Sequence, residues 1–235
     1  MLNNQFTISP LGDSSLIINF GNVIDENINK KVLALFYKLK GLSIPFIKDI
    51  IPAYNSLTIY YNIVITKQKT VSIKTFFEIF SDQLSKVIID HIEILSLPFR
   101  RIKIPVCYTE KYGLDINYIS KEKKLPVDEI IRLHKVKKYR VYMIGFLPGF
   151  AYMGEVDEQI AIPRKVQPRT IIEAGSVGIA GTQTGIYPLN SPGGWQIIGK
   201  TPVKLFIKEK DDPVLLHPGD EVEFYSITEN EFANY

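Results

Sequence analysis

Arginine and glutamine side chains that could bind a small anion are concentrated in one glycine-rich part of the chain. Arg164 and Arg169 each follow a proline in the segment IPRKVQPR, and Gln183 follows the segment AGSVGIAGT. A proline restricts the local backbone and so helps to aim the side chain beside it. Arginine matches a carboxylate or phosphate with two parallel hydrogen bonds, and glutamine can both donate to and accept from an amide. These residue types predict a site for a small anionic substrate with an amide group.

Further polar and aromatic candidates lie in the same glycine-rich part. They are Thr184, Tyr187, Trp195 and Gln196. His134 lies just before a basic run, and a histidine can act as a general acid or base near neutral pH. We predict His134, Arg164 and Gln183 as catalytic residues, and the other four with Arg169 as substrate-binding residues. Purely structural roles stay open, because arginines can tie down loop carbonyls, Trp195 can pack in a core, and His134 can satisfy carbonyls at a helix end.

Other kinds of chemical site are not indicated. The three histidines share no spacing typical of metal ligands, so no metal site is expected. The glycine-rich segments lack the Gly-Lys-Ser/Thr ending of a P-loop. The segment GSVGIAG superficially resembles a dinucleotide fingerprint, but its surroundings predict a strand where that fingerprint needs a helix. The single cysteine, Cys107, excludes an intrachain disulfide, and its strand-like context predicts a buried inert thiol.

Composition narrows the class of protein. Hydrophobic residues make up 46% of the 235 residues, which is ordinary for a globular core. The formal charge of +3 is mild and the lysines are scattered, so no nucleic-acid partner is expected. No segment has the run of about 18 apolar residues that a membrane-spanning helix needs. The first residues show no secretory signal pattern, so we expect a cytoplasmic protein without a membrane partner.

The glycine-rich part is itself expected to be an ordered β structure. Ten of the fifteen glycines and five of the fourteen prolines fall between Gly145 and Gly199, among branched and aromatic residues. Short strand-like runs separated by turns are typical of a barrel or sandwich. The expected strands are 104–108, 140–144, 170–172, 176–180, 183–187, 195–198, 204–207 and 221–226, and short helices are expected over 114–120 and 127–135. This pattern predicts a β-barrel with one or two flanking helices.

The N-terminal half follows a different pattern. Apolar runs predict strands at 15–20, 47–51, 57–63 and 91–97, and apolar residues at helical spacing predict helices after Asp25 and after Ser72. The order βαββαβ is the ferredoxin-like arrangement, in which both helices cover one face of an antiparallel sheet. A short linker, LPFRRIK, separates the halves. We therefore predict an α+β protein with a ferredoxin-like domain at 1–99 and a β-barrel domain at 100–235.

At the level of motifs the chain resembles a known family. The resemblance is carried by GFLPGFAYMG, IPRKVQPRT, AGSVGIAGTQTGIYPLNSPGGWQIIGKTP and HPGDEVEF, and by GDSSLIINFG and DIIPAYNSLTIYY near the N-terminus. It therefore spans nearly the whole chain. The family is that of the 5-oxoprolinase subunit PxpB, also called allophanate hydrolase subunit 1, and it includes the kinase inhibitor KipI. Among ordinary exchanges, Met153 stands where leucine is expected.

The resemblance implies a cyclophilin-like β-barrel for the C-terminal domain, without implying prolyl isomerase activity. It also implies a subunit of an ATP-dependent 5-oxoprolinase, a hydrolase that opens 5-oxo-L-proline to L-glutamate and is inactive as a single chain. The implied partners are a PxpC/KipA-like subunit and a PxpA-like subunit, with ATP acting at the level of the complex. Two alternatives within the family stay open: a KipI-type inhibitor of a sporulation histidine kinase, and a subunit of the allophanate hydrolase or urea carboxylase type.

Overall fold

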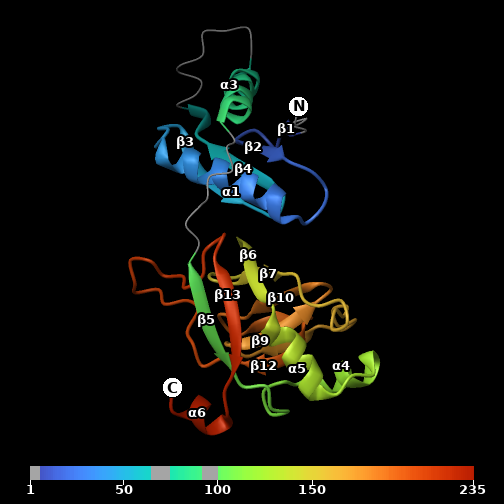
Figure 1. The fold of residues 1–235 in the computed structure, drawn as a ribbon. Coiled ribbons are helices and arrows are strands. Elements are labelled where there is room, and N and C mark those ends of the chain that lie inside the picture. Colours follow the sequence, from blue (N-terminus) through green and yellow to red (C-terminus); the bar gives the residue numbers. More distant parts are fainter. Residues whose placement is uncertain (1–5, 65–74, 92–99) are drawn as a thin grey trace. The chain divides into compact units, whose positions relative to one another are not determined.

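A computed structural model describes residues 6–64, 75–91 and 100–235 of the chain. The chain divides into two compact units, Met1–Pro98 and Phe99–Tyr235. Figure 1 shows a first unit of helices and strands and a second unit dominated by strands. The predicted α+β fold class is confirmed, because the first unit holds an antiparallel sheet with helices and the second is a nearly closed seven-stranded barrel.

The first unit is built on a four-stranded sheet with the order β1-β2-β4-β3. Its elements are β1 (Thr7–Pro10), β2 (Ser15–Asn19), α1 (Glu26–Gly41), β3 (Ile47–Pro52), β4 (Ser56–Tyr61) and α3 (Phe76–His91). Asp25 caps α1, because its carboxylate accepts a hydrogen bond from the backbone N–H of Ile28 at 2.9 Å. The helix therefore begins where the sequence predicts it.

One apolar core joins both helices to the same face of this sheet. The strand residues Leu16 and Leu57 and the helix residues Leu35 and Phe80 belong to this core, and each is at most 3% exposed. Burying one such side chain contributes about 1.5–3 kcal/mol to folding. The prediction that both helices cover one face of the sheet is therefore confirmed.

The sheet differs from the predicted order at one edge. The predicted closing strand at 91–97 lies outside the described residues, except for His91, which ends α3 and is not a strand residue. The edge beside β2 is occupied by β1, which sequence analysis missed, with Thr7 opposite Asn19. The four residues of β1 show no clear alternation of apolar and polar side chains. Their extended conformation is therefore set by pairing with β2, and no alternation of apolar and polar residues in the sequence indicates it.

The second unit is a barrel with the strand order β12-β9-β10-β7-β6-β13-β5. Its strands are β5 (Arg101–Val106), β6 (Lys138–Ile144), β7 (Ala151–Gly154), β9 (Ser176–Ala180), β10 (Gln183–Ile186), β12 (Gln196–Lys200) and β13 (Glu221–Ser226). β5 and β13 are parallel neighbours, and Figure 1 shows them side by side in green and red. Cys107 and Lys200 exchange two backbone hydrogen bonds of 2.9 and 3.0 Å, which brings the two ends of the sheet together.

Three helices and a two-stranded antiparallel sheet complete this unit. They are α4 (Ile116–Lys123), α5 (Val127–Val136), α6 (Glu229–Ala233) and the paired strands β8 (Arg169–Ile172) and β11 (Ser191–Gly193). The predicted strand at 204–207 is wrong, because only Phe206 forms an isolated bridge, to Val214. Residues 101–103, predicted as part of the linker, begin β5. The strands β7 and β11 were not predicted from the sequence.

Side chains of the barrel strands alternate between an inner and an outer face. The inner face holds the main core, in which Val141, Ile179 and Ile186 are fully buried beside Ile130 and Leu133 of α5. The outer face of β7, β9, β10 and β12 carries a separate aromatic cluster. Two polar residues that are consecutive in one strand therefore lie on opposite faces of the sheet and have different surroundings.

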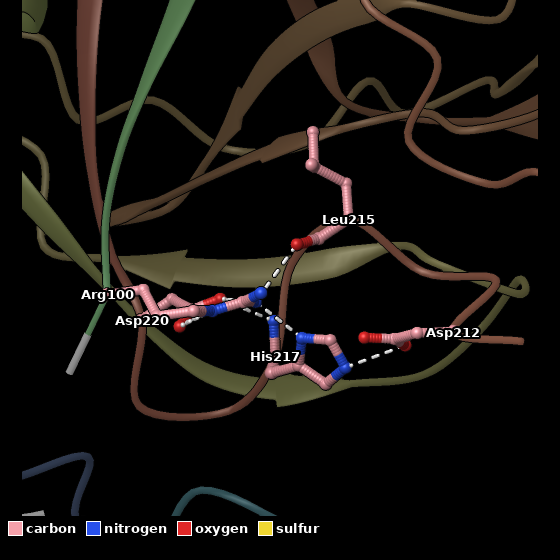
Figure 2. Close-up of polar contacts among 5 residues, drawn as sticks. All are labelled: Arg100, Asp212, Leu215, His217 and Asp220. Carbon is pink, nitrogen blue, oxygen red and sulfur yellow. Dashed lines mark hydrogen bonds and ion pairs between the residues drawn. The ribbon is translucent and has the colours of Figure 1, made fainter. Parts of the chain in front are cut away.

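A polar cluster around Arg100 holds the start of the barrel unit through hydrogen bonds and an ion pair (Figure 2). Arg100 Nε donates to Asp220 Oδ1 at 2.9 Å, and its Nη2 donates to Asp220 Oδ2 at 2.5 Å and to the Leu215 carbonyl at 3.0 Å. The same Nη2 lies 2.5 Å from His217 Nδ1, and His217 Nε2 lies 3.0 Å from Asp212 Oδ1. Because Asp220 is only 4% exposed, Arg100 is bound to a buried carboxylate.

Candidate functional site

An aromatic cluster on the outer face of the barrel forms the base of the candidate site. The ring centroid of Phe150 lies 4.8 Å from that of Tyr152, 5.3 Å from that of Tyr187 and 5.4 Å from that of Trp195. All three pairs meet edge to face, and such pairs contribute about 0.5–1.5 kcal/mol each beyond the burial of area. Phe150, Tyr187 and Trp195 are at most 4% exposed, so these rings form a packed apolar layer, and only Tyr152 is half-buried.

Two glycines make room for these rings on the strands beneath them. A Cβ atom on Gly185 of β10 would lie 3.0 Å from Trp195 Cζ3 and 3.0 Å from Phe150 Cζ. A Cβ atom on Gly178 of β9 would lie 3.1 Å from Trp195 Cβ. These distances are shorter than ordinary carbon–carbon contacts. A side chain at either position would displace the aromatic residues, which explains part of the glycine content of this stretch.

Arg164 places a positive charge over the cluster. Its guanidinium carbon lies 5.8 Å from the centroid of the Trp195 ring, which is within the range of a cation–π contact. Burial raises the pKa of Tyr152, and the charge of Arg164 opposes that rise. Burial also raises the pKa of Tyr187, and a hydrogen bond from the Trp195 backbone and then the charge of Arg164 oppose it. The exposed guanidinium therefore lies within electrostatic reach of both tyrosines.

Gln183 lies on the same outer face. It is the first residue of β10, and strand alternation places it on the side of Gly185 and opposite to the side of Thr184. Its neighbours in the sheet are Ala180 of β9 and Gly154 of β7. Because Gln183 is half-buried and Gly154 has no side chain, its amide can reach a ligand that rests on this face.

Arg169 is bound to a buried carboxylate. Its Nη1 and Nη2 donate to the two carboxylate oxygens of Asp115 at 2.7 and 2.8 Å, which is the bidentate geometry of a strong ion pair. Lys165 Nζ donates to the same carboxylate at 3.0 Å. Asp115 was missed by sequence analysis, since these partners lie 54 and 50 residues away in the chain. Contact of Arg169 with a substrate stays a prediction.

His134 and Thr184 lie on the inner side of the sheet. His134 is 0% exposed, with Tyr108 Oη at 2.9 Å from its Nδ1 and Thr184 Oγ1 at 3.0 Å from its Nε2. Since Thr184 Oγ1 donates to the Gly178 carbonyl, His134 Nε2 carries the proton and donates to Thr184, and Nδ1 accepts from Tyr108. Burial lowers the pKa of His134 to about 3. The ring is therefore neutral near pH 7, and both of its nitrogens are bonded within the protein.

Gln196 is buried on the inner side of β12, with 3% of its surface exposed. Its Nε2 donates to the carbonyl of Pro163, the residue before Arg164, at 3.2 Å. Its Oε1 has no hydrogen-bond partner within the part of the chain that the structure describes. A buried acceptor without a donor costs about 1–3 kcal/mol. This oxygen would therefore gain from a ligand or water that donates to it.

The structure brings half of the predicted site residues to one surface. The outer-face residues are Arg164, Gln183, Tyr187 and Trp195. The residues on the inner side are His134, Thr184 and Gln196. Phe150 and Tyr152 were not among the predicted site residues. Their signal in the sequence is the run Phe-Ala-Tyr, since alternate residues of a strand share a face.

Other kinds of site are not found in residues 6–64, 75–91 and 100–235. In these ranges no group of three or more histidine, cysteine, aspartate or glutamate side chains could hold a metal ion. The described helices include none that is long and apolar enough to cross a membrane. Cys107 is fully buried, which confirms the prediction of a buried thiol.

Comparisons with known proteins agree with this architecture. Residues 6–216 match the family model described as carboxyltransferase domain, subdomain C and D. The chain is 40% identical to the 5-oxoprolinase B subunit of Bacillus subtilis (strain 168), over 98% of its own length and 97% of that protein. It is 33% identical to the 5-oxoprolinase B subunit of Escherichia coli O157:H7, over 91% and 93% of the two chains. The crystal structure of TTHA0988 matches with a TM-score of 0.78 and 32% identity, over 91% of this chain but only 40% of that longer chain.

Proposed function

We propose that this chain is the B subunit of an ATP-dependent 5-oxoprolinase. The chain belongs to the carboxyltransferase C and D subdomain family, and within that family it belongs to the B subunits of 5-oxoprolinase. The complete enzyme would open 5-oxo-L-proline to L-glutamate. The observation that carries the proposal is similarity over nearly the full length of two proteins of that name. The outer face of the barrel supports it, because the groups found there suit a small lactam with a carboxylate.

Each part of 5-oxoproline has a counterpart on this face. Arg164 offers a cationic fork that can bind the carboxylate through two parallel hydrogen bonds. Gln183 offers an amide that can pair with the lactam N–H and C=O groups. The half-buried ring of Tyr152 offers an apolar wall for the methylene groups, and it packs on the buried ring of Trp195 with a centroid distance of 6.0 Å. We therefore assign substrate binding to the outer face.

Opening a lactam requires activation of a poorly electrophilic carbonyl. In the proposed reaction the lactam oxygen takes the terminal phosphoryl group of ATP, and ADP leaves. A first water adds to the activated carbon, the ring C–N bond breaks as the nitrogen gains a proton, and a second water releases phosphate from the resulting acyl phosphate. Arg164 and Gln183 would hold the substrate and stabilise the negative charge that develops during these steps.

The nucleotide is assigned to the complex, since this sequence has no P-loop. The proposed partners are a PxpC/KipA-like subunit and a PxpA-like subunit, and the proposed location is the cytoplasm, where ATP is supplied. This chain accounts for only 40% of the TTHA0988 chain, so a related barrel occurs together with a further polypeptide segment. That arrangement supports a barrel that works beside another subunit.

The inner residues support the site from beneath the sheet. The bond from His134 to Thr184 holds β10 at the residue before Gly185, on which Trp195 and Phe150 rest. This geometry supports a positioning role for His134 and Thr184, and their direct contact with the substrate stays a prediction. Gln196 holds the carbonyl of Pro163 and thereby one side of the loop that carries Arg164.

The proposal is tested by co-expressing the chain with PxpC-like and PxpA-like subunits and measuring ATP-dependent formation of glutamate from 5-oxoproline. We expect turnover by the complete complex and none by the single chain. Robust turnover by the single chain would contradict the role as a subunit. Turnover of a urea-derived substrate, or inhibition of a histidine kinase without glutamate formation, would replace the proposal by the corresponding alternative.

Within this assay Arg164→Lys tests the carboxylate contact. Lysine keeps the charge but loses the fork, and a lost hydrogen bond to a charged group is worth about 1.5–3 kcal/mol. We expect activity to fall about tenfold or more, with the melting temperature unchanged. The matched control is Arg132→Lys, at an exposed arginine paired with Glu129 three residues earlier, which is expected to change little. Unchanged activity in Arg164→Lys would remove this residue from the site.

A further inference from the structure

Asp115 has an unusual position for a residue that precedes a helix. It occupies the N-cap position of α4, where an aspartate ordinarily accepts hydrogen bonds from the first turn, but its side chain makes no such bond. It is also 3% exposed, although aspartate is rarely buried unless paired. The carboxylate therefore serves groups outside its own helix.

Those groups come from the loop that carries Arg164 and from β12. Oδ1 accepts from Lys165 Nζ at 3.0 Å and from Arg169 Nη2 at 2.8 Å. Oδ2 accepts from Arg169 Nη1 at 2.7 Å and from the backbone N–H of Ile197 at 2.7 Å. Each oxygen has two donors, so the acceptor capacity of the carboxylate is fully used. One buried side chain thus binds both ends of the segment 165–169 to the strand beside Trp195.

Asp115 is ionised in this environment. Burial raises the pKa of the carboxyl group, but the hydrogen bonds from Arg169, from Ile197 N–H and from Lys165 outweigh burial and leave the pKa below its ordinary value. Its negative charge lies against two of the three cations in the loop, and those two are only 28% and 24% exposed. The third cation, Arg164, is exposed.

The loop is held on the other side of Arg164 as well. The Pro163 carbonyl accepts from Gln196 Nε2 at 3.2 Å, and the backbone N–H of Lys165 donates to the Gly194 carbonyl at 2.7 Å. Arg164 therefore lies between two fixed neighbours, with its guanidinium 5.8 Å from the Trp195 ring. The backbone carbonyl before Arg164 and the side chain after it are both hydrogen-bonded within the protein.

We infer that Asp115 is a positioning residue for substrate binding: it binds Lys165 and Arg169 so that Arg164 alone of the three loop cations is held over Trp195 to meet the substrate carboxylate. The inference rests on the proposed function for the identity of that substrate. The geometry of the loop around Trp195 and the affinity for an anionic substrate can be measured separately.

The variant Asp115→Asn removes the charge and turns one acceptor into an NH₂ group that faces the donors of Lys165 and Arg169. The geometric readout is acrylamide quenching of Trp195, which is the only tryptophan of the chain and is 4% exposed. We expect the quenching constant to rise about twofold, because local opening of the loop exposes the ring. The matched control is Asp128→Asn, at an exposed aspartate of α5, which is expected to leave quenching unchanged. This readout needs neither a partner nor activity, so it stands even where the proposed function fails.

The kinetic readout uses the reconstituted complex. We expect Asp115→Asn to raise KM for 5-oxoproline about tenfold and to leave KM for ATP within about twofold. In an Arg164→Lys background the same change is expected to cost less than about threefold, because residues that act as a unit are not additive. An equal loss in both backgrounds, or an equal rise of both KM values, would show a general structural role and overturn the inference.

If Asp115→Asn fails to fold, a milder variant, Lys165→Met, tests the positioning role of Asp115. Lys165→Met removes one tie next to Arg164 and leaves the bidentate bond of Arg169 to Asp115 in place. We expect smaller changes in the same directions, of about threefold in KM for 5-oxoproline and a measurable rise in Trp195 quenching. Unchanged quenching and unchanged KM in this variant would overturn the inference.

Discussion

Arg164 and His134 lie on opposite sides of one sheet, so the two side chains have different surroundings and different access to a substrate. Arg164 is exposed over an aromatic surface, whereas His134 is fully buried with both ring nitrogens hydrogen-bonded. The neighbours Gln183 and Thr184 face the same two sides in turn. The sequence predicted His134, Arg164 and Gln183 as catalytic residues and Thr184 as a substrate-binding residue, without indicating which side of a sheet each would face. Strand register assigns each to a side, and that register is fixed by pairing with distant strands.

The burial of His134 predicts a specific pH dependence of stability. Its folded pKa of about 3 lies below the ordinary value of 6.5, so on acidification the unfolded chain takes up the proton first. The stability contributed by the neutral ring is complete above about pH 6.5 and is lost as the pH falls toward 3. Between about pH 7 and about pH 5 this loss amounts to about 2 kcal/mol.

The measurement is denaturant unfolding of the chain and of His134→Gln at both pH values. Glutamine has no proton to gain in this range, so the variant is expected to be less stable at neutral pH but to lose about 2 kcal/mol less on acidification. Comparing the two chains cancels the titration of the other groups. The same pH dependence in both would show that His134 is not held neutral by the fold.

Among the elements of the fold, those with a local period were predictable and those defined by pairing were not. The strand at 221–226 was predicted with its full range, and α5 was predicted to within one residue of its end. The four residues of β1 carry no clear alternation, and their pairing with β2 makes them a strand. The role of Asp115 could not be predicted either, because its hydrogen-bond partners lie in a loop about 50 residues away in the chain. Such contacts are products of the tertiary fold.

The packing of rings on strands leads to a prediction for Gly185→Ala. The new Cβ would lie 3.0 Å from both Trp195 and Phe150, so the rings must shift or the strand must move. Overpacking of this kind costs about 1–3 kcal/mol. We expect a lower melting temperature and a shift in the emission maximum of Trp195.

The control for this variant is Gly41→Ala at the end of α1, where a Cβ atom would meet nothing within 4 Å. It is expected to be neutral or slightly stabilising, because alanine is the better helix former. Wild-type stability and emission in Gly185→Ala would mean that the rings do not rest on this glycine.

For the whole molecule, the barrel unit has the features of a structure that folds by itself. It has its own core, its first and last strands pair in parallel, and a bridge between Cys107 and Lys200 brings the ends of its sheet together. A sheet that is nearly closed leaves little open edge for a further strand to complete. The fragment 99–235 is therefore expected to melt cooperatively, with the same Trp195 emission as the full chain. A broad or absent transition would show that the barrel depends on the first unit.

Arg100 decides where that fragment must begin. Its guanidinium binds both oxygens of Asp220, whose remaining partner among the described contacts is the backbone N–H of His217 at 2.7 Å (Figure 2). In the fragment, Arg100→Met would leave the buried carboxylate of Asp220 with this single donor. We expect the variant to lose about 1–3 kcal/mol of stability. The loss is limited because the guanidinium of Arg100 is half-exposed, so water can replace part of the pair. The matched change Arg101→Met removes a more exposed arginine paired with Glu221 at 2.9 Å and is expected to cost less than about 1 kcal/mol. Thermal melting of the two variants compares these costs directly. If they are equal, Arg100 is an ordinary surface residue and the barrel can begin at β5.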